Sequence, residues 1–216
     1  MDVVLEQLKN GVRRFRADVF PAREEMFREA ATSPQRPHTL FITCADSRID
    51  PNEITGADTG EVFVTRNIGN MVPAYGEMLG GVSAVIEFAV CALGVRHIAV
   101  CGHSDCGAMK ALLDPATTAG MPTVTSWLKN AHAALSVARN LTEKNGTAES
   151  LLETLTEENV LLQLQHLRTH PSVAGAMAQG ELTLSGWLYE IGTGQVTIVS
   201  GQEPSFEPVE IVPNRP

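Results

Sequence analysis

Apolar and polar positions follow two different patterns along this chain of 216 residues. Near the N-terminus the apolar residues recur at helical spacing, which predicts helices over residues 2–17 and 21–31, separated by Pro21. The first of these helices carries an apolar stripe flanked by polar residues, made of Leu5, Leu8, Val12 and Phe15. Such a helix can lie as an arm over a second subunit or pack on its own domain, and the pattern favours neither.

After residue 37, short apolar runs typical of strands alternate with helical segments. The strand-like runs cover residues 39–43, 61–65, 97–101, 182–191 and 195–199, and the longer helical segments cover about 82–93, 123–140 and 148–169. Alternation in the middle of the chain predicts a parallel sheet, and the closing pair of strands predicts an antiparallel edge. We therefore expect an α/β fold, with a central, mostly parallel β-sheet that has an antiparallel edge and is flanked by helices, and with an N-terminal helical arm.

Length and composition favour one compact domain. The hydrophobic content of 44% is enough for one substantial core, and 216 residues is close to the usual size of a single domain. We divide it into a helical arm over residues 1–33, a core over 38–200 and a proline-rich tail over 201–216 that wraps the surface. The net charge of −9 argues against nucleic acid and anionic membranes as partners. The N-terminal segment has no apolar signal core, and no apolar run is long enough to span a bilayer, so we expect a cytoplasmic protein.

Two polar clusters stand where apolar strands end. Cys44 and Asp46 follow one strand, and His103 and Cys106 follow another. Open α/β sheets bind ligands outside the carboxyl ends of their strands, so both clusters can converge on one point. Two thiolates, an imidazole and one oxygen match the ligand preferences of tetrahedral zinc. The pattern therefore predicts a zinc site made by Cys44, His103 and Cys106, with Asp46 beside it.

The two remaining cysteines are expected in the core. Without a secretory signal, the cysteines are more readily thiols or metal ligands than disulfides. Cys101 could join Cys44, His103 and Cys106 in a closed, purely structural zinc site, but it continues an apolar strand and precedes a glycine turn, which favours core packing. Cys91 lies in an apolar run, where buried cysteines are common.

These motifs and several others resemble those of the β-class carbonic anhydrases, in order from about residue 5 to 200. The matching segments are Cys44-Ala45-Asp46-Ser47-Arg48, Arg66-Asn67, Glu87-Phe88-Ala89, Gly102-His103-x-x-Cys106-Gly107 and Gly186-Trp187-Leu188-Tyr189. The resemblance, which is greatest to bacterial and cyanobacterial members with a plant-like active site, implies one Zn²⁺ per subunit. It also implies reversible hydration of carbon dioxide to bicarbonate and a proton by a zinc-bound hydroxide. N-terminal arms exchanged within a homodimer are implied as well, and so is a higher homo-oligomer, a tetramer or an octamer, of which we expect the tetramer.

The resemblance assigns two roles to Asp46. Paired with Arg48, two residues away, Asp46 defines an open form and accepts a proton from the zinc-bound water. If this pair breaks, Asp46 becomes a fourth zinc ligand in a closed form. Some members use the closed form in a bicarbonate-regulated switch with a Trp–Arg–Tyr pocket, whose positions here are Phe41, Arg66 and Tyr189. Phenylalanine has no indole donor, so we expect a constitutively open form.

Five further residues are candidates for substrate binding, and four of them match positions that bind the substrate in the family. Gln35 corresponds to a glutamine that donates its amide across the dimer interface. Phe63, Ile68 and Phe88 correspond to an apolar pocket that suits a small uncharged gas, although on periodicity alone each is also a core residue. The Gly107 amide, at the start of a helix, could donate a hydrogen bond to bicarbonate.

Two other functions are compatible with the same ligands. A related zinc hydrolase could act on another small linear molecule such as carbon disulfide. A non-catalytic zinc protein could be structural or sense bicarbonate. The presence of Asp46, Arg48 and Gln35 together argues against the non-catalytic alternative, because a scaffold needs none of them.

Overall fold

The computed structural model describes residues 2–76, 80–143, 147–200 and 205–210, in two compact units that divide after Arg36. The first unit contains helices α1 (Val3–Arg14), α2 (Phe20–Ala22) and α3 (Glu24–Thr32), with a π-helical turn at Phe15–Val19. The break between helices lies at Arg23 and not at Pro21, because proline in a first helical turn costs no hydrogen bond. None of these helical residues is buried within the chain.

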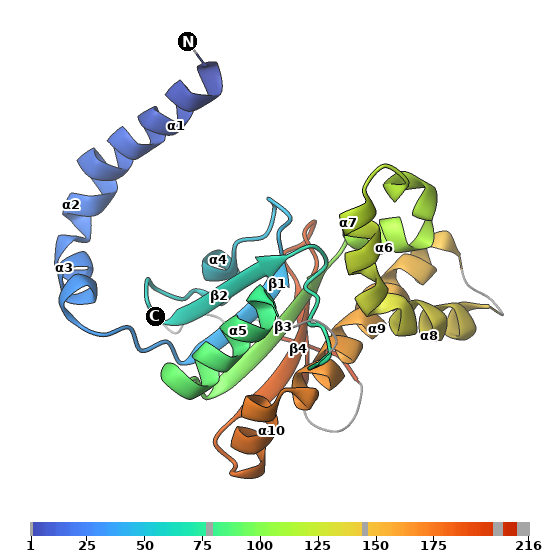
Figure 1. The fold of residues 1–216 in the computed structure, drawn as a ribbon. Helices are drawn as coiled ribbons and strands as arrows, with labels where there is room; N and C mark the ends of the chain where they lie inside the picture. The colour runs from blue at the N-terminus through green and yellow to red at the C-terminus, as the bar shows by residue number, and fades with distance from the viewer. Residues whose placement is uncertain (1, 77–79, 144–146, 201–204, 211–216) are drawn as a thin grey trace. The chain divides into compact units, whose positions relative to one another are not determined.

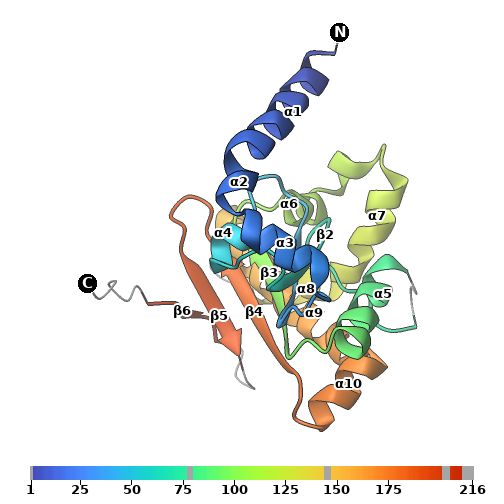
Figure 2. The ribbon, with the colours of Figure 1, turned by 90° about the vertical axis from the view of Figure 1, so that its left-hand side faces the viewer.

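The second unit is built around a six-stranded sheet in the order β2-β1-β3-β4-β5-β6. The strands are β1 (Thr39–Cys44), β2 (Val62–Asn67), β3 (His97–His103), β4 (Thr183–Tyr189), β5 (Val196–Ser200) and β6 (Glu207–Pro208). The first four strands pair in parallel, whereas β5 and β6 are antiparallel, as Figure 2 shows at the edge of the sheet. The predicted fold class is therefore confirmed. Of the predicted tail, residues 201–204 and 211–216 lie outside the described residues.

Helices cover the sheet and extend beyond both of its ends. They are α4 (Pro51–Thr55), α5 (Gly81–Glu87), α6 (Gly107–Leu113), α7 (Pro122–Leu128), α8 (His132–Thr142), α9 (Ala148–Thr169) and α10 (Pro171–Ala178). Figure 1 shows α6, α7 and α8 grouped at one end of the sheet and α10 at the other. The single helix predicted over 123–140 is divided by a 3₁₀ turn at Lys129–Ala131. Within the described residues, no helix is both long and apolar enough to span a membrane.

The long helix α9 packs directly against β3 and β4, and its Val160 lies against both strands. A Cβ atom added to Gly102 would lie 2.8 Å from Val160 Cγ2, and one added to Gly186 would lie 2.6 Å from Val160 Cγ1. Glycine is therefore required at both positions for helix and sheet to approach this closely. This contact fixes α9 behind the strand that ends in His103.

The prediction that Cys91 is buried is wrong, because Cys91 is exposed. Residues 88–92 form a π-helical turn that continues α5, and the buried positions of this segment follow helical spacing at Ser83, Ile86 and Ala89. Cys91 points away from that face. A continuous apolar run thus presented only one side to the core.

Candidate metal centre

Three of the predicted metal ligands meet at the carboxyl ends of two neighbouring parallel strands. Cys44 is the last residue of β1, His103 is the last residue of β3, and Cys106 caps the N-terminus of α6. All three side chains are buried, and one potential ligand atom from each lies within 4.8 Å of the others. The pairing of β1 with β3 brings the two sequence clusters together although Cys44 and His103 lie 59 positions apart in the sequence.

His103 is oriented for coordination through its Nε2 atom. Its Nδ1 atom lies 2.8 Å from the Ser104 carbonyl oxygen, which can only accept, so Nδ1 carries the proton and Nε2 presents a lone pair. Nε2 is buried and has no hydrogen-bond partner among the described residues. A buried acceptor without a partner is costly, and a metal ion at this point would satisfy it. The donor set therefore fits zinc.

The thiol groups of Cys44 and Cys106 shift each other's pKa in opposite directions. A hydrogen bond from the Cys106 thiol lowers the pKa of Cys44 to about 4, and the same interaction raises the pKa of Cys106. The backbone N–H groups of Ala108 and Met109 act in the opposite direction and lower the pKa of Cys106, which favours its thiolate. A divalent cation bound to both sulfurs would leave both as thiolates, because a coordinating thiol is deprotonated.

Asp46 lies beside this cluster and is held by Arg48. Arg48 donates from Nε to Asp46 Oδ1 at 2.9 Å and from Nη2 to Asp46 Oδ2 at 2.7 Å, and its backbone N–H donates to Oδ1 at 3.0 Å. These hydrogen bonds hold the pKa of Asp46 well below its usual range. Asp46 Oδ2 is 3.9 Å from His103 Nε2, so the carboxylate borders the metal position.

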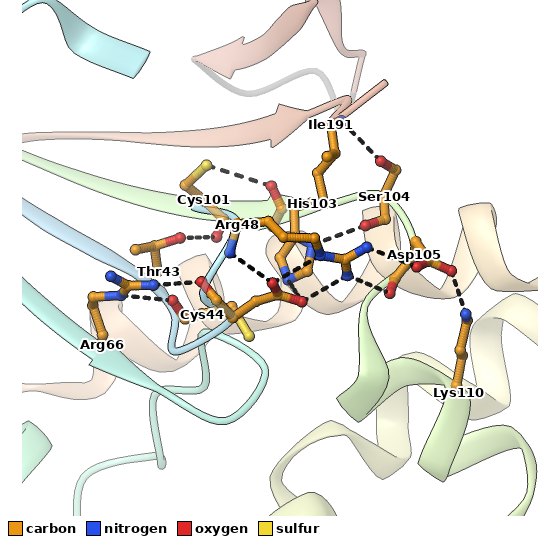
Figure 3. Close-up of polar contacts among 12 residues, drawn as sticks. Thr43, Cys44, Arg48, Arg66, Cys101, His103, Ser104, Asp105, Lys110 and Ile191 are labelled. Carbon is orange, nitrogen blue, oxygen red and sulfur yellow. Dashed lines mark hydrogen bonds and ion pairs between the residues drawn. The ribbon is translucent and has the colours of Figure 1, made fainter. Parts of the chain in front are cut away.

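Arg66 supports the backbone that presents Cys44 and Asp46. It donates from Nε to the Cys44 carbonyl at 3.0 Å and from Nη2 to the Asp46 carbonyl at 2.5 Å (Figure 3). Phe41 and Tyr189, the other two positions that the resemblance assigns to a bicarbonate pocket, belong to one apolar cluster in which Phe41 is almost fully buried. Arg66 thus stabilises the loop after β1 through these two hydrogen bonds.

Cys101 lies outside the metal cluster and is a core residue, as predicted. It is fully buried, and its Sγ donates to the Gly102 carbonyl at 3.4 Å. Burial raises the pKa of its thiol to about 12, which keeps it protonated.

The predicted substrate residues are divided between the two units of the chain. The rings of Phe63 and Phe88 lie 6.2 Å apart, and the side chains of Phe88 and Ile68 are 49% and 43% exposed. Gly107 begins α6, and the space beside its Cα is open. Gln35 is exposed and belongs to the first unit. The substrate role of all five residues remains a prediction.

The sequence interpretation missed two charged residues next to the site. Asp105 accepts a hydrogen bond from Arg48 and another from Lys110, which belongs to α6 (Figure 3). The only signal in the sequence is that Asp105 occupies the spacer between His103 and Cys106. Nothing in that spacing indicates a contact with Arg48, 57 positions earlier.

Comparison with known proteins identifies the family. A family model described as carbonic anhydrase matches residues 39–196. A structure described as the β-carbonic anhydrase CcaA superposes with a TM-score of 0.92 at 37% identity, over 97% of this chain and 94% of that one. The chain belongs to the β-carbonic anhydrase family.

Curated and structural relatives of this β-carbonic anhydrase cover most of its length. A carbonic anhydrase of Pseudomonas aeruginosa is 45% identical over 94% of this chain and 90% of that protein. One from Synechococcus elongatus is 44% identical over 91% of this chain and 72% of that protein. One of two structures described as tetrameric β-carbonic anhydrases from Sordaria macrospora has a TM-score of 0.82 at 26% identity, over 92% of this chain and 98% of that one.

Proposed function

We propose that this β-carbonic anhydrase hydrates carbon dioxide reversibly to bicarbonate and a proton with one Zn²⁺ per chain, held by Cys44, His103 and Cys106. The observation that carries the proposal is the buried cluster of two sulfurs and one imidazole, whose Nε2 has no partner among the described residues. Two thiolates and an imidazole are a typical three-ligand set of catalytic zinc sites, which keep a fourth position for water or substrate.

Zinc at this position would supply a Lewis acid that makes water nucleophilic near neutral pH. Asp46 borders the same position, and Arg48 keeps its carboxylate ionised. An ionised carboxylate only accepts hydrogen bonds, so Asp46 would fix the orientation of the attacking water by accepting one of its protons in a hydrogen bond. The bidentate pair with Arg48 corresponds to the open form, and we propose that this form is constitutive. Asp46 would be a fourth ligand only after that pair breaks.

The remaining assignments concern the substrate and the assembly. We propose that Phe63, Ile68 and Phe88 provide apolar walls for carbon dioxide, and that the Gly107 amide donates a hydrogen bond to bicarbonate. Gln35 would donate its amide to the substrate across the dimer interface. A cytoplasmic homodimer that assembles to a tetramer is supported by the Sordaria macrospora relative described as tetrameric and by the exposed apolar stripe of α1. In this proposal residues 1–33 act as an arm of a single catalytic domain.

The test is stopped-flow hydration of carbon dioxide with zinc measured on the same sample. The wild-type protein should contain one zinc per chain and be active. Cys106→Ser should lose most of its zinc and at least about tenfold in activity, because a thiolate ligand is removed. Cys91→Ser is the matched control, since Cys91 is exposed and outside the cluster, and it should keep both. Zinc-replete wild-type protein that hydrated no carbon dioxide at any alkaline pH would contradict the proposal, and hydrolysis of carbon disulfide by such a protein would identify the alternative.

A further inference from the structure

Arg48 is held on both edges of its guanidinium group, and the second edge is bound by Asp105. One edge, formed by Nε and Nη2, binds the Asp46 carboxylate. On the other edge, Nη1 donates to Asp105 Oδ2 at 2.9 Å and Nη2 donates to the Asp105 carbonyl oxygen at 3.3 Å (Figure 3). A rigid planar guanidinium bound on two edges has little freedom to rotate.

Asp105 is itself fixed in place by its backbone and by Lys110. Its φ angle is +59°, in the left-handed region that aspartate tolerates better than most residues. In this conformation both the carbonyl and the carboxylate of Asp105 reach the same guanidinium. Lys110, which lies on α6, binds the other carboxylate oxygen, Oδ1. The carboxylate is therefore held between two cations and keeps Oδ2 directed at Arg48.

The contact between Arg48 and Asp105 joins the two halves of the metal centre. Arg48 belongs to the loop after β1, which carries Asp46, and Asp105 lies between His103 and Cys106 in the turn after β3. With Asp46 as its only partner, Arg48 could move together with that loop. With Asp105 as a second partner, Arg48 keeps a defined position relative to the metal ligands, and so does the Asp46 carboxylate.

We propose that Asp105 is a positioning residue that holds Arg48 against Asp46 and thereby keeps the Asp46 carboxylate off the metal. This inference rests on the proposed function, because it assigns to Asp105 control over the open form of the same site. It predicts that removing the Asp105 carboxylate loosens Arg48 and allows Asp46 to reach zinc more often.

Two substitutions at Asp105 separate its charge from its backbone. Asp105→Gly removes the carboxylate but adopts the left-handed conformation without strain and keeps the carbonyl acceptor. Asp105→Asn keeps a side-chain oxygen that can accept from Arg48 but carries no charge. Glu143→Gln is the matched control, since it makes the same change in net charge at the exposed end of α8. Zinc content and unfolding are measured for each variant before any comparison.

Two readouts report on the position of Asp46. In crystals of the zinc-loaded Gly variant, Arg48 should leave its bidentate position in part of the molecules, and Asp46 should occupy a second conformer directed at zinc. In solution, the pH at which kcat falls to half of its plateau should rise by roughly 0.3–0.7 units, as expected for loss of one exposed ion pair that holds the open form. KM should stay unchanged, because a closed fraction lowers only the number of active sites. The Asn variant should shift less and the control not at all.

A merely structural role for Asp105 would lower the unfolding midpoint and leave both readouts as in wild type. That outcome, or an unchanged Asp46–Arg48 pair in crystals of both variants, would overturn the proposal. Failure of the proposed function is recognised separately, as wild-type protein with full zinc and no hydration activity. In that case the position of Arg48 in the variant crystals still decides whether Asp105 holds it.

Discussion

The contact of Val160 with Gly102 predicts a measurable coupling between α9 and the strand that carries His103. A methyl group at position 102 would lie 2.8 Å from Val160 Cγ2 and 3.4 Å from atoms of Leu188 and Thr156. Carbon atoms in proteins do not approach to 2.8 Å, and Val160 is fully buried, so either β3 or α9 must move. Gly102→Ala therefore overpacks this interface, and Val160→Ala should relieve it.

The expected free energies follow from the size of the groups involved. Overpacking costs about 1–3 kcal/mol, from which about 0.5–1 kcal/mol is regained because alanine restricts the unfolded chain more than glycine. Gly102→Ala should thus lower the free energy of unfolding by about 1 kcal/mol. Val160→Ala removes two buried methyl groups at about 0.8 kcal/mol each and leaves a cavity, for a loss of about 2–3 kcal/mol. In the double variant the new methyl occupies part of that cavity, so its loss should be about 1–2 kcal/mol smaller than the sum.

The assay is a double-mutant cycle by urea unfolding of the zinc-loaded protein at one protein concentration. Zinc affinity is measured in parallel, because Gly102 directly precedes His103 and a shift of β3 would move this ligand. Gly120→Ala is the control, since a Cβ at Gly120 meets no atom within 4 Å. Single-variant losses that add to within about 0.5 kcal/mol in the double variant would refute the packing argument.

Three further predictions concern burial and pH. Arg48→Met should be less stable than wild type at pH 6, because Arg48 lowers the pKa of Asp46 in the folded protein. The difference in the free energy of unfolding should shrink as the pH falls below about 4, since protonation of the Asp46 carboxylate removes the stabilisation by Arg48; urea unfolding at several pH values measures this difference. Burial lowers the pKa of His97, so wild type should lose stability as the pH falls through about 6.5, and His97→Gln should lose less between pH 7 and 5 in the same assay. Gln163→Leu should lower the free energy of unfolding by about 1–3 kcal/mol, because buried Gln163 accepts the Val72 N–H at 2.8 Å and leucine leaves that donor without a partner.

Strands and the metal cluster were predictable from local sequence. Each run of apolar residues that ended in a polar cluster became a strand, and the ends of β1 and β3 meet because neighbouring parallel strands share one edge. Residue types then restricted the chemistry, since few ions other than zinc suit two thiolates and an imidazole. The prediction therefore needed only the position of each cluster at the end of a strand.

Helix faces were less predictable. Within the apolar run after α5, nothing in the residue types distinguishes Ala89, which is buried, from Cys91, which is exposed. Which side of a helix faces the core depends on where the sheet lies, and that is set by distant packing such as the contact of Val160 with Gly186. The 3₁₀ turn that divides the helix predicted over 123–140 likewise left no clear sequence signal.

Contacts between distant charged residues were not predictable at all. The pairing of Asp46 with Arg48 follows from a spacing of two residues, but the contact of Arg48 with Asp105 depends on the register of β1 against β3. Arg66 is a similar case, because its hydrogen bonds to the carbonyls of Cys44 and Asp46 arise only from the pairing of β2 with β1.

The ion pair between Arg48 and Asp46 restricts how a proton can leave the site. A general base works best when its pKa is near the working pH, and Arg48 moves the pKa of Asp46 in the opposite direction, well below its usual range. Asp46 is therefore suited to orient a water molecule and poorly suited to carry a proton away at neutral pH. The proton produced by hydration must pass to a group that titrates near neutrality, or to buffer in solution. In the proposed mechanism, a stronger ion pair between Arg48 and Asp46 favours the open form, and the same ion pair makes Asp46 a poorer proton carrier.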